Sequence, residues 1–64
     1  KINNISSNTF TNNSDYGIYF GSRSNDNLIS DNSFTENNYA VRIKTSEKNT
    51  VINNLIINNR YGVS

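Results

Sequence analysis

The chain has no cysteine, histidine, methionine, tryptophan or proline among its 64 residues, and only three glycines. Without cysteine there is no disulfide, and without cysteine and histidine the usual ligands of a structural zinc ion are missing. A chain this short buries only about 60% of the surface that it exposes when unfolded, so its core alone would stabilise it marginally. We therefore expect independent stability only if the same pattern continues beyond both ends.

Charge and hydrophobicity favour neither a nucleic-acid partner nor a membrane partner. Six Lys and Arg residues against five Asp and Glu residues leave a net charge of +1, which is too small to attract nucleic acid or an acidic membrane. No apolar run approaches the roughly 20 residues that span a bilayer, and no signal peptide opens the chain. The first residue is not methionine and already lies within the pattern described next, so we expect a fragment of a longer array.

Asparagine is the most abundant residue, and it recurs in register. The pattern of residues 27–41 occurs again about 24 residues earlier and about 22 residues later, so one unit is written three times. Three asparagine columns result: Asn3, Asn27 and Asn49; Asn8, Asn32 and Asn54; and Asn13, Asn37 and Asn59. Composition alone would indicate a disordered polar tract, but self-similarity at a fixed period predicts a solenoid.

Short apolar pieces in each copy have the composition of β-strands. β-branched and aromatic residues dominate them, and none has helical spacing over a useful length. The first and second pieces centre on one residue in each copy: Ile5, Ile29 and Val51 for the first, and Phe10, Phe34 and Ile56 for the second. The third piece, at 18–20 and 41–43, alternates between inward and outward residues. The sequence therefore predicts coils at approximately 1–26, 27–48 and 49–64, with three short strands in each complete coil.

Stacked coils would place identical residues on one another, about 4.8 Å apart in parallel ladders. An asparagine amide both donates and accepts hydrogen bonds, so each amide can bond to the amides above and below it. On this basis Asn8, Asn32 and Asn54 are interpreted as an inward structural ladder. For the column that starts at Asn13, an inward ladder and a solvent-facing turn remain equal alternatives.

These residues carry a family resemblance through one spaced pattern: Ile29-x-x-Asn32-x-Phe34-x-x-Asn37-x-x-Ala40-Val41-x-Ile43. The pattern resembles the right-handed parallel β-helix repeat, most closely the asparagine-rich form in NosD-like proteins and in archaeal and bacterial surface proteins. That family is related to carbohydrate-binding and sugar-hydrolase β-helix modules. The resemblance covers essentially the whole chain, and it implies an all-β, right-handed, single-stranded parallel β-helix.

A leucine-rich repeat is the main alternative, because its L-x-x-N-x-L motif has the same start. A leucine-rich repeat continues with leucine-spaced residues, whereas this chain has leucine only at Leu28 and Leu55. It also has a further alternating strand at Val41. These two differences favour the β-helix.

The sequence contains few residues that could act in catalysis or bind a metal ion. Glycoside hydrolysis needs two carboxylates at a controlled spacing of about 5 to 10 Å, and all carboxylates here fall in predicted turns: Asp15, Asp26, Asp31, Glu36 and Glu47. The resemblance to NosD suggests a copper role, but copper favours His, Met or Cys, and none is present. Pairs of turn carboxylates could contact calcium, although unpaired turn residues are the simpler interpretation. We expect no catalytic residue, no cofactor and no metal within this segment.

One outward surface supports a binding hypothesis. Tyr19 aligns with Arg42 on the outer face of the third strand, and Lys44 follows along the strand. An aromatic ring can stack on a sugar ring, and an arginine can bind a carboxylate through two hydrogen bonds. These three residues are therefore candidate contacts for an acidic polysaccharide; the alternative is that they are ordinary solvated residues.

A second outward surface is apolar. In the third copy Ile52, Leu55 and Ile57 occupy positions where the second copy has serine and threonine. Such a patch is expected to be covered by another segment or to contact a protein. The alternative is a register shift of one residue, which would turn these side chains inward.

Three functional hypotheses remain. The first is a β-helix segment of a secreted or surface protein that contacts polysaccharide through the outer face of the sheet that carries Tyr19. The second is part of a polysaccharide lyase, hydrolase or epimerase whose catalytic residues lie outside the segment. The third, implied by the resemblance, is a NosD-like periplasmic maturation factor for a copper enzyme. All three predict an extracellular, cell-surface or periplasmic location.

Overall fold

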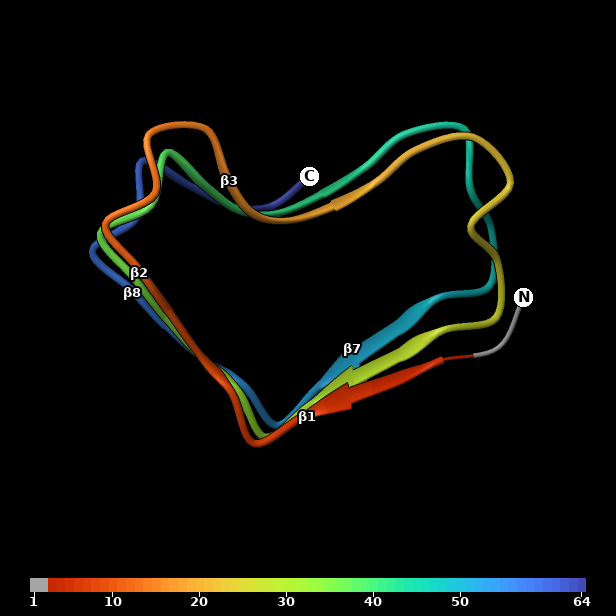
Figure 1. Cartoon of the computed structure of the whole chain (residues 1–64), viewed down its shortest axis with the longest axis horizontal. Helices are drawn as coiled ribbons and strands as arrows, with labels where there is room; N and C mark the ends of the chain where they lie inside the picture. Colours follow the sequence, from red (N-terminus) through yellow and green to blue (C-terminus); the bar gives the residue numbers. More distant parts are fainter. Residues whose placement is uncertain (1–2) are drawn as a thin grey trace.

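The computed structural model describes residues 3–64 and contains nine short strands in three stacked turns (Figure 1). The first turn holds β1 (Asn4–Ser6), β2 (Thr9–Thr11) and β3 (Tyr16–Phe20). The second turn holds β4 (Leu28–Ser30), β5 (Ser33–Thr35) and β6 (Tyr39–Ile43). The third turn holds β7 (Thr50–Ile52), β8 (Leu55–Ile57) and β9 (Tyr61–Val63). Residues 1 and 2, where the first coil was expected to start, lie outside the described residues.

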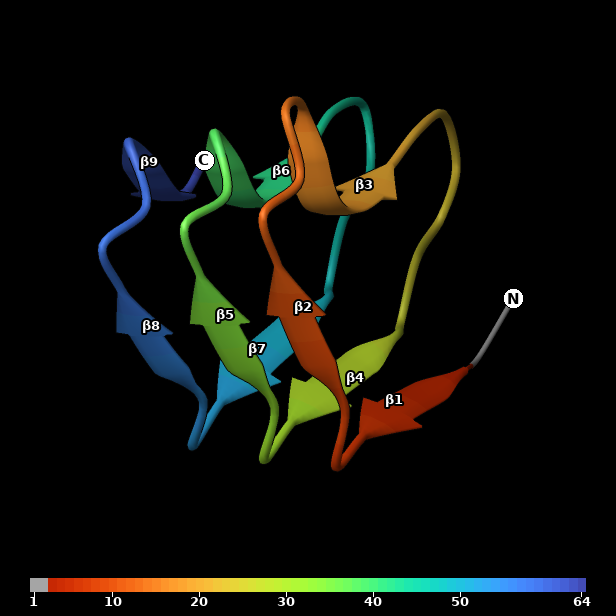
Figure 2. The ribbon, with the colours of Figure 1, turned by 60° about the vertical axis from the view of Figure 1, so that its left-hand side comes forward.

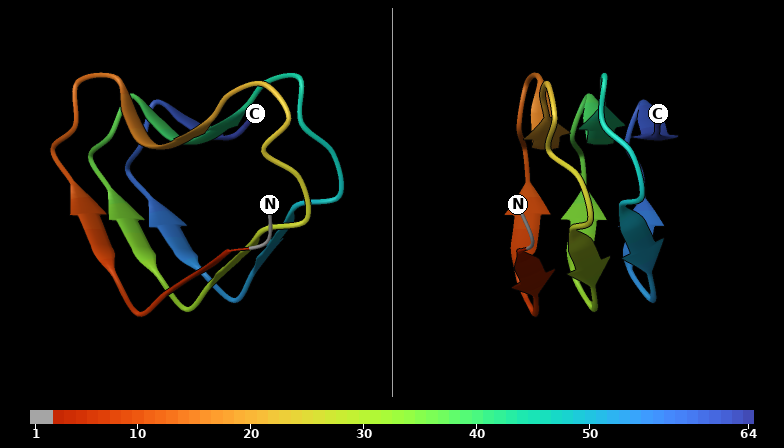
Figure 3. Two further views of the ribbon diagram at one scale, coloured as in Figure 1. Left: turned by 45° about the vertical axis from the view of Figure 1, so that its right-hand side comes forward. Right: turned by 90° about the vertical axis from the view of Figure 1, so that its right-hand side faces the viewer.

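Each strand pairs in parallel with its counterpart in the neighbouring turn, which produces three sheets of three strands. We name them sheet A (β1-β4-β7), sheet B (β2-β5-β8) and sheet C (β3-β6-β9). Figures 2 and 3 show the three turns side by side, with the first turn toward the viewer of Figure 1. In Figure 1 the chain runs clockwise as it recedes, so the helix is right-handed. The prediction of an all-β parallel β-helix is confirmed.

The leucine-rich-repeat alternative is wrong, because residues 3–64 form three strands in each turn and contain no helix. No described helix could therefore cross a membrane. The strands of sheet C also differ from the expectation, since β3 and β6 begin two residues earlier, at Tyr16 and Tyr39. Ala40 and Val41 are adjacent in sequence and both fully buried. Simple alternation fails at this bend, and for that reason the sequence pattern located only the later part of each strand.

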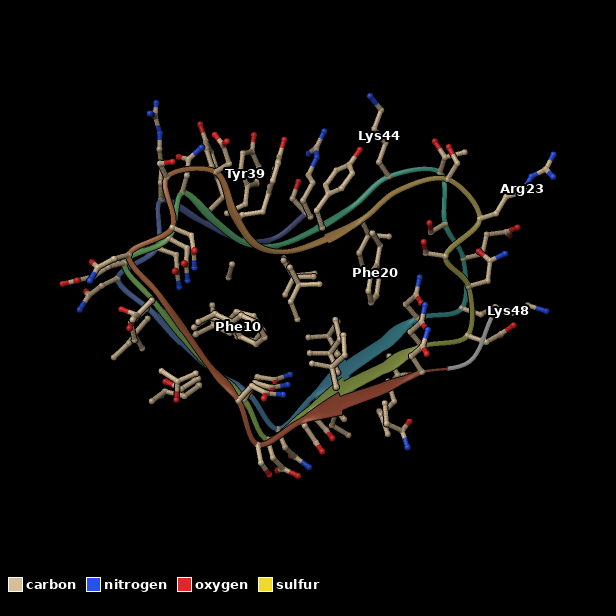
Figure 4. All side chains as sticks on the ribbon, viewed as in Figure 1. Phe10, Phe20, Arg23, Tyr39, Lys44 and Lys48 are labelled. Carbon is tan, nitrogen blue, oxygen red and sulfur yellow. The ribbon has the colours of Figure 1, made fainter. Side chains whose placement is uncertain are left out.

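Apolar side chains from all three sheets fill the interior. The middle turn is covered on both sides, and its Ile29, Phe34 and Val41 have no exposed surface. Phe34 stacks on Phe10 of the first turn, with ring centroids 4.9 Å apart and an interplanar angle of 11°. Figure 4 shows Phe10 and Phe20 pointing into this interior. Partly buried residues from all three turns pack against the same cluster: Ile5, Phe10, Ile43, Val51 and Ile56.

The corners of the helix are made by residues in the left-handed backbone conformation, and none of them is glycine. Each ladder asparagine from Asn8 onward follows such a residue: Ser7, Asn12, Asp26, Asp31, Glu36, Lys48, Asn53 and Asn58. A positive φ turns the chain sharply at a steric cost for a residue that has a Cβ. It also directs the next backbone N–H away from the carbonyls that it would meet in a regular sheet.

The asparagine side chains supply the hydrogen bonds that the corners interrupt. Oδ1 of Asn32 accepts the backbone N–H of Asn8 at 2.9 Å and the Nδ2 of Asn8 at 3.3 Å. Nδ2 of Asn32 donates to the carbonyl of Ile5 at 2.9 Å and to Oδ1 of Asn54 at 3.1 Å. The amide of Asn32 thus makes four hydrogen bonds although the residue is only 3% exposed.

The other two asparagine columns repeat this arrangement. For the column of Asn37 the sequence left an inward ladder and a solvent-facing turn as equal alternatives. In the structure Asn37 faces inward and is 3% exposed. Its Oδ1 accepts both the N–H and the Nδ2 of Asn13, at 3.2 and 2.6 Å. Asn27 accepts the equivalent pair from Asn3, at 2.9 and 3.1 Å. Three ladders therefore run along the helix, whereas the left-handed residues Arg23 and Thr45 are followed by serine.

Replacing Asn32 by aspartate tests the ladder with almost no change in shape. The variant Asn32→Asp loses both donated hydrogen bonds and places a charge beside Oδ1 of Asn54. An unsatisfied buried group costs about 1–3 kcal/mol, and more if charged, so we expect a loss of at least about 3 kcal/mol at neutral pH by urea denaturation. Burial raises the pKa of the new carboxyl, so stability should be highest at low pH and fall as pH rises. Asn53→Asp at the exposed neighbouring corner is the control, and an equal loss there would contradict the ladder.

A methyl group at Gly17 should disturb the bend between sheets B and C. A Cβ there would lie 2.6 Å from the carbonyl oxygen of Ala40 and 3.0 Å from the ring of Phe34. Overpacking of this kind costs about 1–3 kcal/mol, so the Gly17→Ala variant should unfold at lower denaturant concentration. At Gly21 the nearest contact would be an ordinary 3.5 Å, and Gly21→Ala should leave the midpoint unchanged or raise it slightly. Equal effects of the two substitutions would show that the clash is relieved.

Candidate functional site

The outer side of sheet C carries a concentration of aromatic and cationic side chains. We call it the aromatic–cationic face, and it consists of Tyr16, Tyr19, Tyr39, Arg42, Lys44, Arg60 and Tyr61. Figure 4 shows Tyr39 and Lys44 projecting from this sheet on the side opposite to Phe20. The strands of sheet C contain no Asp or Glu, although Asp15 directly precedes β3. All four tyrosines of the chain lie on this face.

Three of these tyrosines form a column along the helix axis. Tyr16 is the register partner of Tyr39, and Tyr39 is the register partner of Tyr61. Their ring centroids are 5.4 Å and 4.6 Å apart, with interplanar angles of 39° and 25°. The spacing follows from the separation of about 4.8 Å between strands. The column remains accessible, since Tyr16 is 39% and Tyr61 is 43% exposed.

Arginine side chains lie against the column. The guanidinium carbon of Arg42 is 5.3 Å from the ring centroid of Tyr39, and that of Arg60 is 5.4 Å from the ring of Tyr61. Nη1 of Arg42 also donates to Oγ of Ser64 at 2.9 Å. At an exposed site each cation–π contact contributes about 0.5–1 kcal/mol. These contacts hold both guanidinium groups close to the ring surfaces and reduce their freedom before any ligand binds.

The structure brings two of the predicted site residues directly together. Tyr19 and Arg42 are register partners on β3 and β6. Tyr19 packs on Tyr16 of the same strand, with centroids 4.9 Å apart, as Arg42 packs on Tyr39 one turn later. Lys44 follows β6, is exposed, and donates its backbone N–H to the carbonyl of Phe20 at 2.9 Å.

Sequence reasoning missed the tyrosine column and Arg60 as parts of this face. When the three copies of the repeat are aligned, Tyr16, Tyr39 and Tyr61 fall in one column. The alignment does not show that β3 and β6 start early, and this early start makes the first residue of each strand an outward one. A repeated aromatic residue at the coil period was the available signal.

The described residues offer an open surface and a limited set of polar groups. Residues 3–64 form no pocket, and within them no group of three or more His, Cys, Asp and Glu residues could hold a metal ion. The five carboxylates lie outside the strands: Asp15, Asp26, Asp31, Glu36 and Glu47. The aromatic–cationic face can bind by hydrogen bonds, charge and ring contact, but it presents no pair of carboxylates for acid–base chemistry.

The apolar surface of the third turn is also outward. Ile52, Leu55 and Ile57 are 48%, 54% and 46% exposed. Their partners in the second turn are Ser30, Ser33 and Thr35. The alternative of a register shift is therefore wrong, because the strand register points these side chains outward. They are exposed apolar residues of the third turn, with Ile52 on β7 and the other two on β8.

Comparison with known proteins gives one family. Residues 1–64, the whole chain, match the family model described as "Periplasmic copper-binding protein (NosD)". No curated protein and no solved structure matches the chain.

The side chains of this segment do not fit the copper in that description. Copper in proteins is bound by imidazole, thiolate and thioether groups, and the chain has no histidine, cysteine or methionine. Tyrosine hydroxyls and turn carboxylates remain, and the carboxylates are dispersed over different corners. No copper chemistry is therefore assigned to these residues.

We expect the 64-residue chain to take up no Cu(I) or Cu(II) in competition with a weak chelator, as followed by isothermal titration and by metal analysis after gel filtration. A positive control can be built on sheet B, where the hydroxyls of Thr11 and Thr35 are 3.1 Å apart on neighbouring strands. The double variant Thr11→His, Thr35→His places two imidazoles side by side and should gain Cu(II) binding. Stoichiometric uptake by the unchanged chain would show that the remaining oxygen donors suffice.

Proposed function

This chain belongs to the NosD family of periplasmic proteins, and we propose that it is a non-catalytic β-helix segment that contacts an acidic polysaccharide. The contact surface is the aromatic–cationic face of sheet C. The periplasmic location of the family lies within the range of locations that the sequence predicted.

One observation carries this proposal: the tyrosine column flanked by arginines on a sheet whose strands contain no acidic residue. Arginine binds carboxylates through two parallel hydrogen bonds, whereas the ammonium of Lys44 acts as a point charge. The hydroxyl groups of the tyrosines can donate to and accept from sugar hydroxyls. Both the charge and the hydrogen-bonding capacity therefore suit a chain of sugar acids.

The stacking within the column determines how a sugar can approach it. The ring of Tyr39 lies between the rings of Tyr16 and Tyr61, and the guanidinium of Arg42 also lies over it. A sugar can then meet only the outer edge and the hydroxyl of Tyr39, while the ring of Tyr19 is 47% exposed. We assign ring stacking to Tyr19, and hydrogen bonding to the hydroxyl row of the column.

The direction of the ligand follows from the arrangement of the cations. Arg42 belongs to the second turn and Arg60 precedes β9 in the third. A polymer that runs along the helix axis, across the strands, meets one cation and one tyrosine hydroxyl in each of these turns. A polymer that runs along a single strand would meet only one turn.

The family match supports a second role, as part of an accessory factor for the maturation of a periplasmic copper enzyme. In that role the aromatic–cationic face would serve as a docking surface for an acidic partner. Metal-handling residues would then have to come from outside this segment, because its own donors do not fit copper.

Further coils of the same chain at both ends also form part of the proposal. The ladder bonds have a direction, since the N–H and Nδ2 of one turn donate to Oδ1 of the next turn. A preceding turn could therefore donate to the first-turn asparagines, and a following turn could accept from the third. Both ends offer asparagines at the same spacing: Asn3, Asn8 and Asn13 at one end, and Asn49, Asn54 and Asn59 at the other.

The double variant Tyr19→Ala, Arg42→Ala tests the polysaccharide proposal. We expect its affinity for polygalacturonate to fall by about tenfold or more, equivalent to about 1.4 kcal/mol, because one ring and one guanidinium leave the face. Binding is measured by titration of the chain with the polymer at several salt concentrations, with a neutral galactan as the reference ligand.

Lys48→Ala is the matched control for charge. It removes the same single positive charge from a corner that points away from the aromatic–cationic face (Figure 4). Its affinity should stay within about twofold of the unchanged chain at moderate salt, because distant exposed charges are screened. Equal losses of affinity in both variants would show that binding depends on net charge alone. Unchanged affinity in the double variant would show that the aromatic–cationic face is not the binding site.

A further inference from the structure

Tyrosine is the side chain of this protein that is most open to one-electron oxidation. The usual competitors, cysteine, methionine, tryptophan and histidine, are all absent. The four tyrosines lie together on the aromatic–cationic face, and those with the greatest exposure are Tyr19 at 47% and Tyr61 at 43%. An oxidant that reaches this protein will therefore act on a single surface.

The tyrosine column holds rings of adjacent turns at contact distance. Tyr39 and Tyr61 have centroids 4.6 Å apart and an interplanar angle of 25°, which is the closest and most parallel of the tyrosine pairs described. The backbone fixes this pairing, since the N–H of Tyr61 donates to the carbonyl of Asn38 at 2.8 Å. The partner of each ring is thus determined by the strand register and not by chance encounter.

We propose that Tyr39 and Tyr61 form a site of oxidative cross-linking, with a haem peroxidase and hydrogen peroxide as the oxidising system. Each phenol loses one electron and one proton and becomes a phenoxyl radical. The two radicals join through the ring carbons next to their hydroxyl groups, and the new C–C bond replaces two C–H bonds after each ring regains its aromatic state. The two hydrogen atoms reduce one hydrogen peroxide to two waters.

The geometry permits this coupling with local movement only. The rings start nearly face to face and have to turn about their Cβ–Cγ bonds until their edges meet. Both rings project outward from sheet C, where no core side chain opposes this rotation. The bond would join the second and third turns covalently in a protein that has no disulfide to do so.

Controlled oxidation of the 64-residue chain tests the proposal. After treatment with peroxidase and a limiting amount of hydrogen peroxide, we expect dityrosine fluorescence and a monomer that has lost two hydrogen atoms by mass spectrometry. Trypsin cleaves after Lys and Arg, which places Tyr39 in peptide 24–42 and Tyr61 in peptide 61–64. The main cross-linked product should join these two peptides.

Substitutions that keep the ring but remove the hydroxyl isolate the pair. Tyr61→Phe should reduce intramolecular dityrosine several-fold, whereas Tyr19→Phe should leave its yield unchanged. Cross-linked chain should also unfold at a higher temperature than untreated chain, because one turn is closed into a loop. The proposal is overturned if the 24–42 to 61–64 product is absent, if it forms equally well in denaturant, or if only intermolecular dimers appear.

Discussion

The hydrogen-bonded asparagine amide is the interaction on which this fold depends. A β-helix has to turn sharply several times in every coil, and here the turns use left-handed residues that carry side chains rather than glycine. Each turn interrupts the backbone pairing between neighbouring coils. The buried amide one residue later restores it, because it accepts two hydrogen bonds from the coil before it and donates to both neighbouring coils. The side-chain amide thus replaces the hydrogen bonds that the backbone would make in a regular sheet. For this reason a polar side chain can be only 3% exposed without losing hydrogen bonds.

The same interaction organises the outer surface. Each buried asparagine bonds to the equivalent asparagine of the neighbouring coil, and this pairing matches the strand register, so every other column is aligned as well. Phe10 lies on Phe34 inside the helix, and Tyr39 lies on Tyr61 outside it, for the same reason. The strand register alone aligns the row of aromatic rings on the surface, without any contribution from contacts between the rings. Both the binding face and the cross-linking site are consequences of a register that is set in the interior.

Much of this could be predicted from the sequence, because a repeated chain provides its own alignment. The period and the strand centres at Ile29 and Phe34 depend on residue type alone, and so does the outward position of Ile52. The orientation of Asn37 could not be decided, since asparagine suits both a buried ladder and an exposed turn, and only the backbone of the preceding Glu36 separates the two. The start of β3 and β6 was missed for a different reason. At Ala40 and Val41 two successive residues face inward, and a rule based on alternation cannot detect a strand that contains a bend.

The direction of the ladder bonds makes the two ends of each asparagine column different. In all three columns Oδ1 faces the preceding coil and the adjacent backbone N–H faces the following one. The neighbouring backbone bonds run the other way, because the N–H of Ser33 donates to the carbonyl of Asn8 and the N–H of Leu55 to that of Asn32, so the stack has no large net dipole. The ladder columns themselves end differently: the first coil presents Oδ1 atoms, and the last coil presents backbone N–H groups. A coil that continues these columns therefore has to supply donors at the first end and acceptors at the last.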